Sequence, residues 1–188
     1  MTKGPLIILS GPSGSGKTTV TSRLLAGSAL PLRQSISATT RAPRPGEIDG
    51  VHYYFLTPEE FRRKLDAGDF LEWAQVFGDY YGTPREAVER MRDQGIGQLL
   101  VIDVQGAAQV RKSCPDLTSI FLTTPSLKVL EERLRARHSE DEPRIQQRLT
   151  TARTELSRAG EYNYQVVNDD LETTVRELRS IITPLFRE

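Results

Sequence analysis

The chain has 188 residues and carries 25 lysines and arginines against 25 aspartates and glutamates, so its formal net charge is zero. This length is typical of one domain with a buried core, and the balanced charge lacks the basic excess with which proteins bind nucleic acids. The first apolar run, Leu6 to Leu9, is too short for a signal sequence or a membrane span. We therefore expect a cytoplasmic protein with no nucleic-acid and no membrane partner.

The first predicted elements are a strand over Leu6 to Ser10, a glycine-rich loop and a helix over Thr19 to Leu25. The loop, Gly11-Pro12-Ser13-Gly14-Ser15-Gly16-Lys17-Thr18, matches the pattern G-x-x-x-x-G-K-[ST] at every defined position. Its backbone N–H groups and the helix N-terminus form a concave anion site, in which Lys17 contacts the β- and γ-phosphates of a nucleotide and the Thr18 hydroxyl ligates Mg²⁺. A glycine-rich turn without a ligand is the alternative, which the complete match disfavours.

An insertion with a different composition, rich in Thr, Arg, Pro, Gly and Tyr, begins near Ser35. Within it, Arg41 and Arg44 lie on a segment stiffened by two prolines. A guanidinium group can donate two parallel hydrogen bonds to the oxygens of one phosphate. We interpret this segment as a second anion site, for an acceptor nucleotide. A solvated loop in which the two arginines pair with Glu47 and Asp49 is the alternative.

Helices are predicted inside and after the insertion. Thr57-Pro58-Glu59-Glu60 and Thr83-Pro84-Arg85-Glu86 both have the pattern of a helix N-terminus with a capping box. Apolar stripes then predict two helices, one through Leu127, Leu130 and Leu134 and one through Ile145, Leu149, Ala152 and Leu156. We interpret the polar segment His138 to Glu142 between them as the tip of a hairpin that moves as a lid.

Three further short apolar runs, 99–103, 118–122 and 165–167, are strand candidates that alternate with the helices. Strands of this kind are buried on both faces of a parallel sheet, so the pattern predicts an α/β domain. The phosphate loop does not define the reaction, because GTPases, motors and small-molecule kinases share it.

Several strings of residues resemble guanylate kinase, a family of P-loop nucleoside-monophosphate kinases. They occur in the family's order over nearly the whole chain: Ser37 to Gly46, Gly50 to Phe55, Phe70 to Ala74, Tyr80 to Thr83, Ile102 to Gly106 and Val167 to Asp170. The resemblance implies a parallel sheet of about five strands with helices on both faces, and transfer of the γ-phosphoryl group of Mg-ATP to GMP. It also implies a single domain over 1–188, composed of a core (1–34, 89–124 and 151–188), a GMP-binding insertion (35–88) and a helical lid (125–150).

For the GMP site, the resemblance implies one set of residues for the phosphate and one for the base. Arg41, Arg44, Tyr53 and Tyr81 match the phosphate ligands, and Ser37, Glu72 and Thr83 match the guanine ligands. Guanine has hydrogen-bond donors at N1 and N2 and an acceptor at O6, so a carboxylate and a hydroxyl complement it. A buried carboxylate is costly without a partner, and a ligand would explain one at Glu72.

For the donor nucleotide, the resemblance implies a site that comprises Gly11 to Thr19 together with Asn168 and Asp169. Asn-Asp-Asp is also an ordinary turn at the end of a strand. Asp103, at the end of a predicted strand, is implied either to orient Mg²⁺ through water or to contact the GMP base.

The predicted catalytic residues are Lys17, Arg44, Arg137 and Arg148. Arg137 and Arg148 match the family's lid arginines, which close over the transferring phosphoryl group as arginine fingers of the same chain. Arg133 is a weaker match. The alternative is a solvated helix face on which these arginines pair with neighbouring glutamates.

A few residues depart from the family pattern or stay outside the predicted site. Many relatives have an acidic residue where this chain has Val101, and Gly or Asn where it has His138. We interpret His138 and His52 as solvent-facing, because transfer to an ionised phosphate needs no base. The single cysteine, Cys114, has no Cys or His companions and is interpreted as a loop thiol.

Two other functions stay open. A non-catalytic guanylate-kinase-like module that binds phosphopeptides is disfavoured, because Lys17, Thr18 and the lid arginines are all present. A kinase for another nucleoside monophosphate is disfavoured by Glu72 and Thr83. The expected partners are the small molecules GMP and ATP, with dGMP left open, and the expected assembly is a monomer or a small homo-oligomer.

Overall fold

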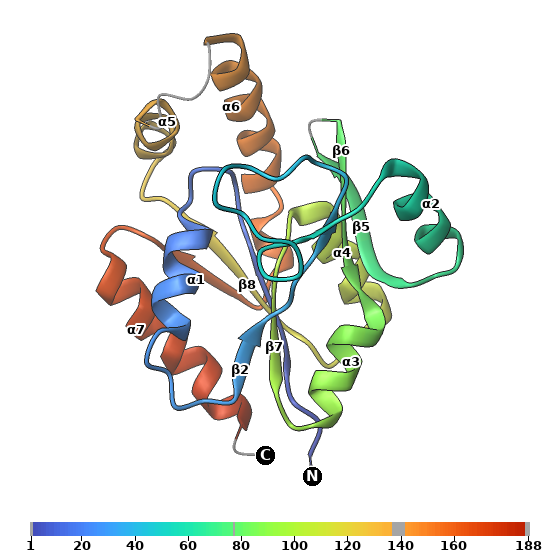
Figure 1. Cartoon of the computed structure of the whole chain (residues 1–188). Helices are drawn as coiled ribbons and strands as arrows, with labels where there is room; N and C mark the ends of the chain where they lie inside the picture. Colours follow the sequence, from blue (N-terminus) through green and yellow to red (C-terminus); the bar gives the residue numbers. More distant parts are fainter. Residues whose placement is uncertain (1, 77, 137–141, 187–188) are drawn as a thin grey trace.

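The computed structural model describes residues 2–76, 78–136 and 142–186. Its centre is a five-stranded parallel sheet in the order β2-β7-β1-β8-β9 (Figure 1). The strands are β1 (Leu6–Ser10), β2 (Leu32–Gln34), β7 (Gly97–Val101), β8 (Thr118–Thr123) and β9 (Tyr164–Val167). The predicted α/β class is confirmed. Strand β2 is absent from the sequence-based prediction, because only the first of its residues is apolar and buried.

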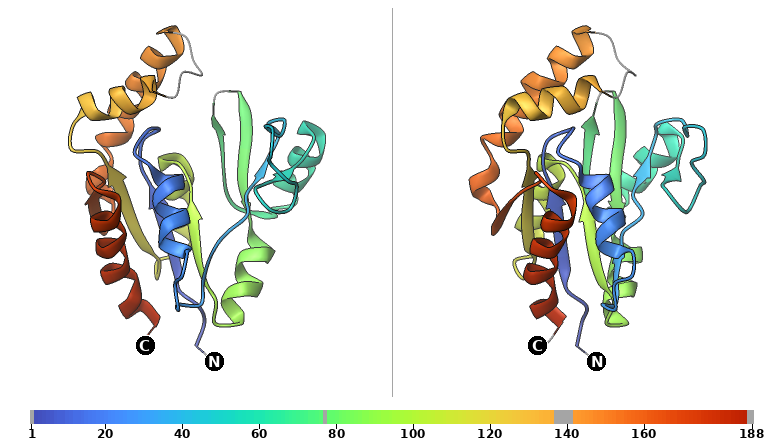
Figure 2. Two further views of the ribbon diagram at one scale, coloured as in Figure 1. Left: turned by 60° about the vertical axis from the view of Figure 1, so that its left-hand side comes forward. Right: turned by 90° about the vertical axis from the view of Figure 1, so that its left-hand side faces the viewer.

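Helices cover both faces of this sheet, as parallel strands require (Figure 2). On one face, Ile7 and Leu9 of β1 share an apolar cluster with the first and last helices, and on the other face Leu6 and Ile8 share a cluster with the two helices that flank β7. These helices are α1 (Lys17–Leu25), α7 (Leu171–Ile182), α3 (Arg85–Asp93) and α4 (Val104–Ser113). Strand β1 is therefore buried on both faces, which fixes the loop that follows it.

A second sheet, mixed and four-stranded, has the order β4-β3-β6-β5. Its strands are β3 (Ala38–Thr39), β4 (Tyr54–Phe55), β5 (Phe70–Val76) and β6 (Asp79–Pro84). Helix α2 (Pro58–Asp66) packs on it through Phe61, whose ring stacks on Phe70 with centroids 4.6 Å apart. The capping box predicted for this helix is confirmed: the Thr57 N–H donates to the Glu60 carboxylate at 2.8 Å, and the Glu60 N–H donates to Thr57 Oγ1 at 3.2 Å.

The second predicted capping box, at Thr83, is wrong. Strand β6 continues to Pro84, which precedes α3 as its N-terminal cap residue without a side-chain hydrogen bond. Thr83 instead pairs with Glu72 of β5, at a point where the register shifts between Phe70 and Glu72. Bulges of this kind re-aim side chains and are frequent beside functional sites.

The predicted helical hairpin is formed by α5 (Leu127–Arg135) and α6 (Glu142–Leu156). The stripes are confirmed for Leu130 and Leu134, which share a separate apolar cluster with Ile145, Leu149 and Ala152. Leu127 is 42% exposed instead, and Leu156 packs against the core beneath the central sheet. Of the predicted tip, His138 to Glu142, all residues up to position 141 lie outside the described residues. Figures 1 and 2 show the hairpin and the second sheet on either side of the phosphate-loop end of the central sheet. The residue limits predicted for core, insertion and lid stay a prediction.

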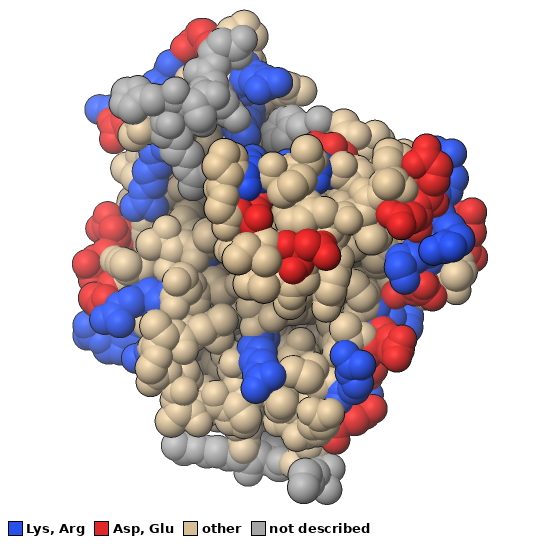
Figure 3. Space-filling view, in the orientation of Figure 1, with Lys and Arg blue, Asp and Glu red and all other residues tan. Residues whose placement is uncertain are grey.

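Two short 3-10 helices, η1 (Ala159–Glu161) and η2 (Thr183–Phe186), complete the described elements. In the part of the chain that the structure describes, no helix has both the length and the apolar character needed to cross a membrane. On the face shown in Figure 3, acidic and basic side chains are interspersed, as expected from the zero net charge.

Candidate active site

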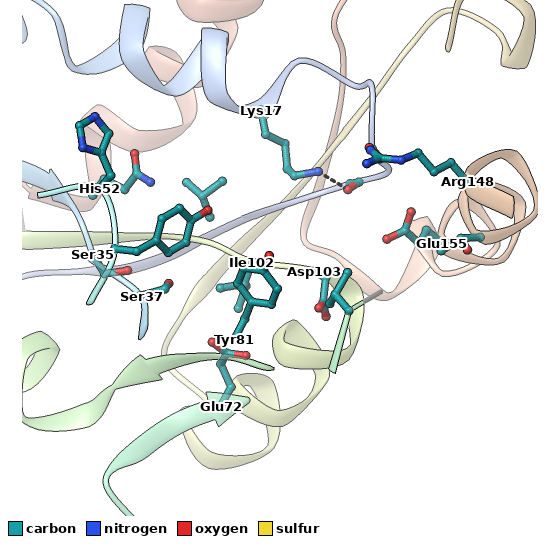
Figure 4. A pocket seen from close by; sticks show the side chains of 17 residues that line it. Lys17, Ser35, Ser37, His52, Glu72, Tyr81, Ile102, Asp103, Arg148 and Glu155 are labelled. Carbon is teal, nitrogen blue, oxygen red and sulfur yellow. Dashed lines mark hydrogen bonds between the residues drawn. The ribbon is translucent and has the colours of Figure 1, made fainter. Parts of the chain in front are cut away.

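A cavity of about 320 Å³ opens at the C-terminal end of the central sheet, between the second sheet and α6 (Figure 4). Ligands of open α/β sheets bind at this edge, outside the carboxyl ends of the strands. The cavity brings together residues that were predicted for both nucleotides: Gly11, Ser13, Lys17, Ser37, Tyr53, Glu72, Tyr81, Asp103 and Arg148.

The phosphate loop is held in its curved conformation by a glycine and an asparagine. Gly16, which caps α1, has a left-handed backbone with φ of 93°, and a Cβ there would collide with Asn168 Nδ2. Asn168 Nδ2 donates to the Ser15 carbonyl at 2.7 Å, and Oδ1 accepts from Thr174 Oγ1 at 3.2 Å. The Asn168 side chain therefore supports the loop, and its contact with adenine stays a prediction.

Two cationic side chains from different elements meet at this loop. Lys17 Nζ donates to the carbonyl oxygens of Gly11 at 2.5 Å and Pro12 at 3.1 Å. Arg148, on α6, donates from Nη1 to Ser13 Oγ at 2.7 Å. Figure 4 shows both side chains directed toward the same stretch of the loop. This arrangement suits a ligand that carries several negative charges.

A buried carboxylate and a buried hydroxyl form a pair on the insertion side of the cavity. Thr83 Oγ1 donates to Glu72 Oε1 at 2.5 Å, and the two residues are 0% and 5% exposed, respectively. Burial is the largest cause that raises the pKa of Glu72, to about 7; the Asp103 charge also raises it, and the Thr83 hydrogen bond lowers it. A carboxyl group held this way lacks enough hydrogen-bond donors for its charged form, and a ligand with N–H groups would supply them.

Ser35 is a cavity residue that sequence reasoning missed. It is 7% exposed, and its hydroxyl is a buried polar atom without a hydrogen-bond partner among the described residues. Buried polar groups are nearly always paired, so an orphaned one beside a cavity indicates a site that a ligand or water completes. No motif marked it, because Ser35 precedes the recognisable string that begins at Ser37.

The predicted acceptor-phosphate residues are organised around Arg41. Its guanidinium forms a two-pronged ion pair with Glu47, with Nη1 and Nη2 at 3.0 and 2.9 Å from the carboxylate oxygens. Its Cζ atom lies 5.4 Å from the ring centroid of Tyr53. The Tyr53 and Tyr81 rings meet edge-on, with their centroids 6.1 Å apart. The Arg41–Glu47 pair that the solvated-loop alternative expected is therefore present, although only 14% and 17% of these side chains are exposed, so the pair is not a solvated one. Asp49 takes no part in it, since Asp49 accepts from the Phe55 N–H at 2.8 Å.

A second, polar cavity of about 460 Å³ lies between the insertion and the lid. Arg41 and Arg44 border it from one side, and Arg144 and Arg148 border it from α6. Tyr81 contributes a phenol to the same space. Four arginines, two from the insertion and two from α6, therefore border one space, as transfer of a phosphoryl group between two nucleotides would require.

Glu155 is a further cavity residue absent from the prediction. It stands seven residues after Arg148 on α6, so both side chains lie on the same face of the helix. Burial raises the pKa of Glu155 to about 7; the Lys17 charge and a hydrogen bond from the Ser13 backbone lower it, and the Asp103 charge raises it. The i, i+7 spacing from a predicted arginine was the signal that could have identified it.

Asp103 serves as the N-terminal cap of α4. The strand predicted over 99–103 ends at Val101, and Asp103 Oδ1 accepts from the N–H groups of Gln105 at 2.7 Å and Gly106 at 2.9 Å. Residues 2–76, 78–136 and 142–186 contain no group of three or more His, Cys, Asp or Glu side chains that could hold a metal. Mg²⁺ bound with a nucleotide needs only one or two protein ligands, and the Thr18 hydroxyl and Asp103 carboxylate are of the right oxygen type.

Some predicted residues lie elsewhere. Thr18 and Thr19 are exposed in the first turn of α1, and Asp169 is exposed after β9; none of them lines either cavity. Arg137 and His138 lie outside the described residues. Arg133 donates from Nη2 to the Asn168 carbonyl at 2.9 Å, so it joins α5 to the end of β9.

His52 is exposed, as predicted, and it also lines the first cavity. Its Nδ1 accepts the Ile48 N–H at 3.0 Å, which leaves Nε2 as the protonated nitrogen of the neutral ring.

The parallel sheet and the glycine-rich loop that leads into α1 define the class of P-loop nucleotide-binding proteins. Comparison with known proteins narrows the class. The family described as "Guanylate kinase" matches residues 3–185. Guanylate kinases of Synechocystis sp. and Synechococcus sp. are 50% and 49% identical over 185 and 183 residues, which is 96% and 97% of this chain and 94% and 84% of those proteins. The crystal structure of guanylate kinase from Anaplasma phagocytophilum is 36% identical with a TM-score of 0.81, over 100% of this chain and 88% of that one. The chain belongs to the guanylate kinase family.

Proposed function

We propose that this protein transfers the γ-phosphoryl group of ATP to GMP, giving ADP and GDP. The observation that carries the proposal is the Glu72 carboxylate, which lines the same cavity as Lys17 of the phosphate loop and accepts from the fully buried Thr83 hydroxyl behind it. A carboxylate that needs hydrogen-bond donors fits guanine, which has them at N1 and N2. Relatives named guanylate kinase, about half identical over nearly the full length, support the same activity.

The acceptor would bind across the second sheet. Glu72 would accept hydrogen bonds from the guanine N–H groups, while Ser37 is a hydroxyl available for O6. Arg41, Arg44, Tyr53 and Tyr81 would hold the GMP phosphate, and the Glu47 ion pair already orients the Arg41 guanidinium for it. Because GMP carries an ionised phosphate, its oxygen can attack without a catalytic base.

The donor would bind along the phosphate loop, from Gly11 to Thr19. Thr18 and Asp103 are the residues that would hold Mg²⁺, the first directly and the second through water; bound with the triphosphate, the ion supplies positive charge to the β- and γ-phosphates. Asn168 and Asp169 are proposed for the adenine side. This assignment rests on the resemblance, and the Ser15–Asn168 hydrogen bond fixes Asn168 against the loop.

Transfer would form a bond between a GMP phosphate oxygen and the γ-phosphorus, and break the bond from that phosphorus to the β–γ bridging oxygen. Lys17, Arg44 and Arg148 would neutralise the charge on the transferring group and exclude water, and we assign Arg137 to the same role by resemblance. Arg144 borders the same space and is added to this set.

The proposal is tested by steady-state rates of ADP formation from ATP with GMP, AMP, CMP or UMP as acceptor. We expect kcat/KM for GMP to exceed that for AMP by about 10⁴ or more, because AMP leaves the polar site unpaired. Comparable rates with AMP would favour a kinase for another nucleotide. Absent turnover with retained GMP binding would favour the non-catalytic module.

A further inference from the structure

Gly106, in the first turn of α4, lies directly against the Glu72 side chain. A Cβ built at Gly106 would lie 2.8 Å from Glu72 Cδ and 3.4 Å from Cγ, and closer still to Oε2. These atoms belong to the middle of the side chain as well as its end. A methyl group there therefore cannot be accommodated by a small rotation of the carboxylate.

The backbone of α4 does not itself require glycine at this position. Gly106 lies within the helix and is not among the glycines with positive φ, so alanine would be conformationally allowed and is the better helix former, by up to about 1 kcal/mol. Its N–H is already used by the Asp103 cap. The space taken by Glu72 is the feature that explains the glycine.

Helix α4 is also fixed to β5, so the two elements cannot move apart to make room. The Gln109 side chain donates to the Trp73 carbonyl at 2.6 Å and accepts from the Trp73 N–H at 3.2 Å. On the other side of Glu72, Leu71 shares a core cluster with Val104 and Ala107 of the helix. The Glu72 carboxylate is therefore confined between Gly106 and Thr83, with Thr83 holding Oε1 and Gly106 facing Oε2.

We propose that Gly106 is a positioning residue for guanine specificity: the missing side chain leaves the slot in which Glu72 is held in the orientation that accepts the N1 and N2 hydrogens. The inference rests on the proposed GMP kinase function. It assigns to α4 a part in selecting the acceptor nucleotide. Loss of the slot would displace the Glu72 oxygens by an ångström or more, a misplacement that costs about a hundredfold in rate.

The test compares Gly106→Ala with Gly160→Ala, the matched control. Gly160 has no positive φ, and a Cβ there meets no heavy atom within 4 Å. We expect Gly106→Ala to lower kcat/KM for GMP by about a hundredfold, to narrow the GMP-to-AMP ratio and to leave the KM for ATP unchanged. Gly160→Ala should match the wild type in all three. GMP kinetics of Gly106→Ala within twofold of the wild type, or equal losses for GMP and AMP, would overturn the inference.

A stability measurement separates this role from a general effect on folding. In the Glu72→Ala background the obstacle is gone, so adding Gly106→Ala should raise the melting temperature, whereas the same change in the wild type should lower it. If Gly106→Ala lowers the melting temperature equally in both backgrounds, or if the double variant does not fold, the proposed slot for Glu72 is contradicted. The wild-type assay keeps the two proposals apart: a wild type inactive on GMP refutes the proposed function, and an active wild type with an equally active Gly106→Ala refutes only this inference.

Discussion

At the scale of single residues, the charged form of Glu72 destabilises the folded protein when no ligand is bound. Burial raises its pKa from 4.5 to about 7, so between these values the folded chain binds more protons at this site than the unfolded chain does. The free energy of unfolding therefore falls as the pH rises through that window. Glu155, whose pKa burial also raises to about 7, acts in the same direction near Lys17.

Glu72→Gln removes this cost, because the amide is neutral at every pH. We expect the variant without ligands to melt at a higher temperature than the wild type at pH 8, and by a smaller margin at pH 5. Each kcal/mol gained corresponds to about 2 to 4 °C in a chain of this size. Calorimetry at both pH values measures the margins, and a margin that does not change with pH would show that the carboxylate is not destabilised.

The same substitution should damage catalysis. The amide keeps one acceptor but turns an N–H toward a guanine donor, and hydrogen bonds to charged groups contribute roughly 1.5 to 3 kcal/mol. We expect kcat/KM for GMP to fall about ten- to two-hundredfold and the GMP-to-AMP ratio to shrink. Kinetics with both acceptors decide this. If GMP and AMP fall by the same factor, Glu72 does not read the base.

At the scale of elements, α4 combines a structural and a proposed chemical role at Asp103. Asparagine caps helices about as well as aspartate, so Asp103→Asn should melt close to the wild type. Asp103→Ala loses the cap and should melt at a lower temperature. Loss of the charge near the proposed Mg²⁺ site should still lower kcat about ten- to a hundredfold. Turnover and melting curves for both variants separate the roles. Unchanged kcat in Asp103→Asn would leave this residue as a helix cap only.

The elements that could be predicted from the sequence are those whose cause is local. The phosphate loop and the Thr57 cap depend on residues adjacent in the chain, and the lid helices show clear apolar stripes. Thr83 has the local pattern of a cap, but its hydroxyl bonds Glu72 across the sheet, and a strand partner is not visible in the local sequence. Strand β2 is held by its parallel pairing with β7, not by its own apolar content.

The same distinction applies to the candidate site. Residues of the recognisable strings were found, whereas Ser35 and Glu155 enter the cavity through tertiary packing and belong to no string. The Gly106 slot is also a tertiary feature, because only the structure shows that Glu72 occupies the space of the missing side chain.

At the scale of the whole molecule, the open space between insertion and lid predicts closure. Arg41 and Arg44 on one side and Arg144 and Arg148 on the other border a cavity of about 460 Å³, and all must approach a single phosphoryl group for transfer. We expect X-ray scattering to give a smaller radius of gyration with a bisubstrate analogue than without ligand. Identical profiles in the two states would argue against closure.

The central claim, ATP-to-GMP phosphoryl transfer from a loop site to a separate insertion site, is tested most directly with ATP labelled at the γ-phosphate. With the wild type, the label should appear in the β-phosphate of GDP. With Lys17→Met it should not, within the assay time, because the charge at the donor phosphates is lost, whereas calorimetry should show GMP binding nearly intact. Label released as inorganic phosphate, or GMP binding lost together with activity in Lys17→Met, would contradict the account.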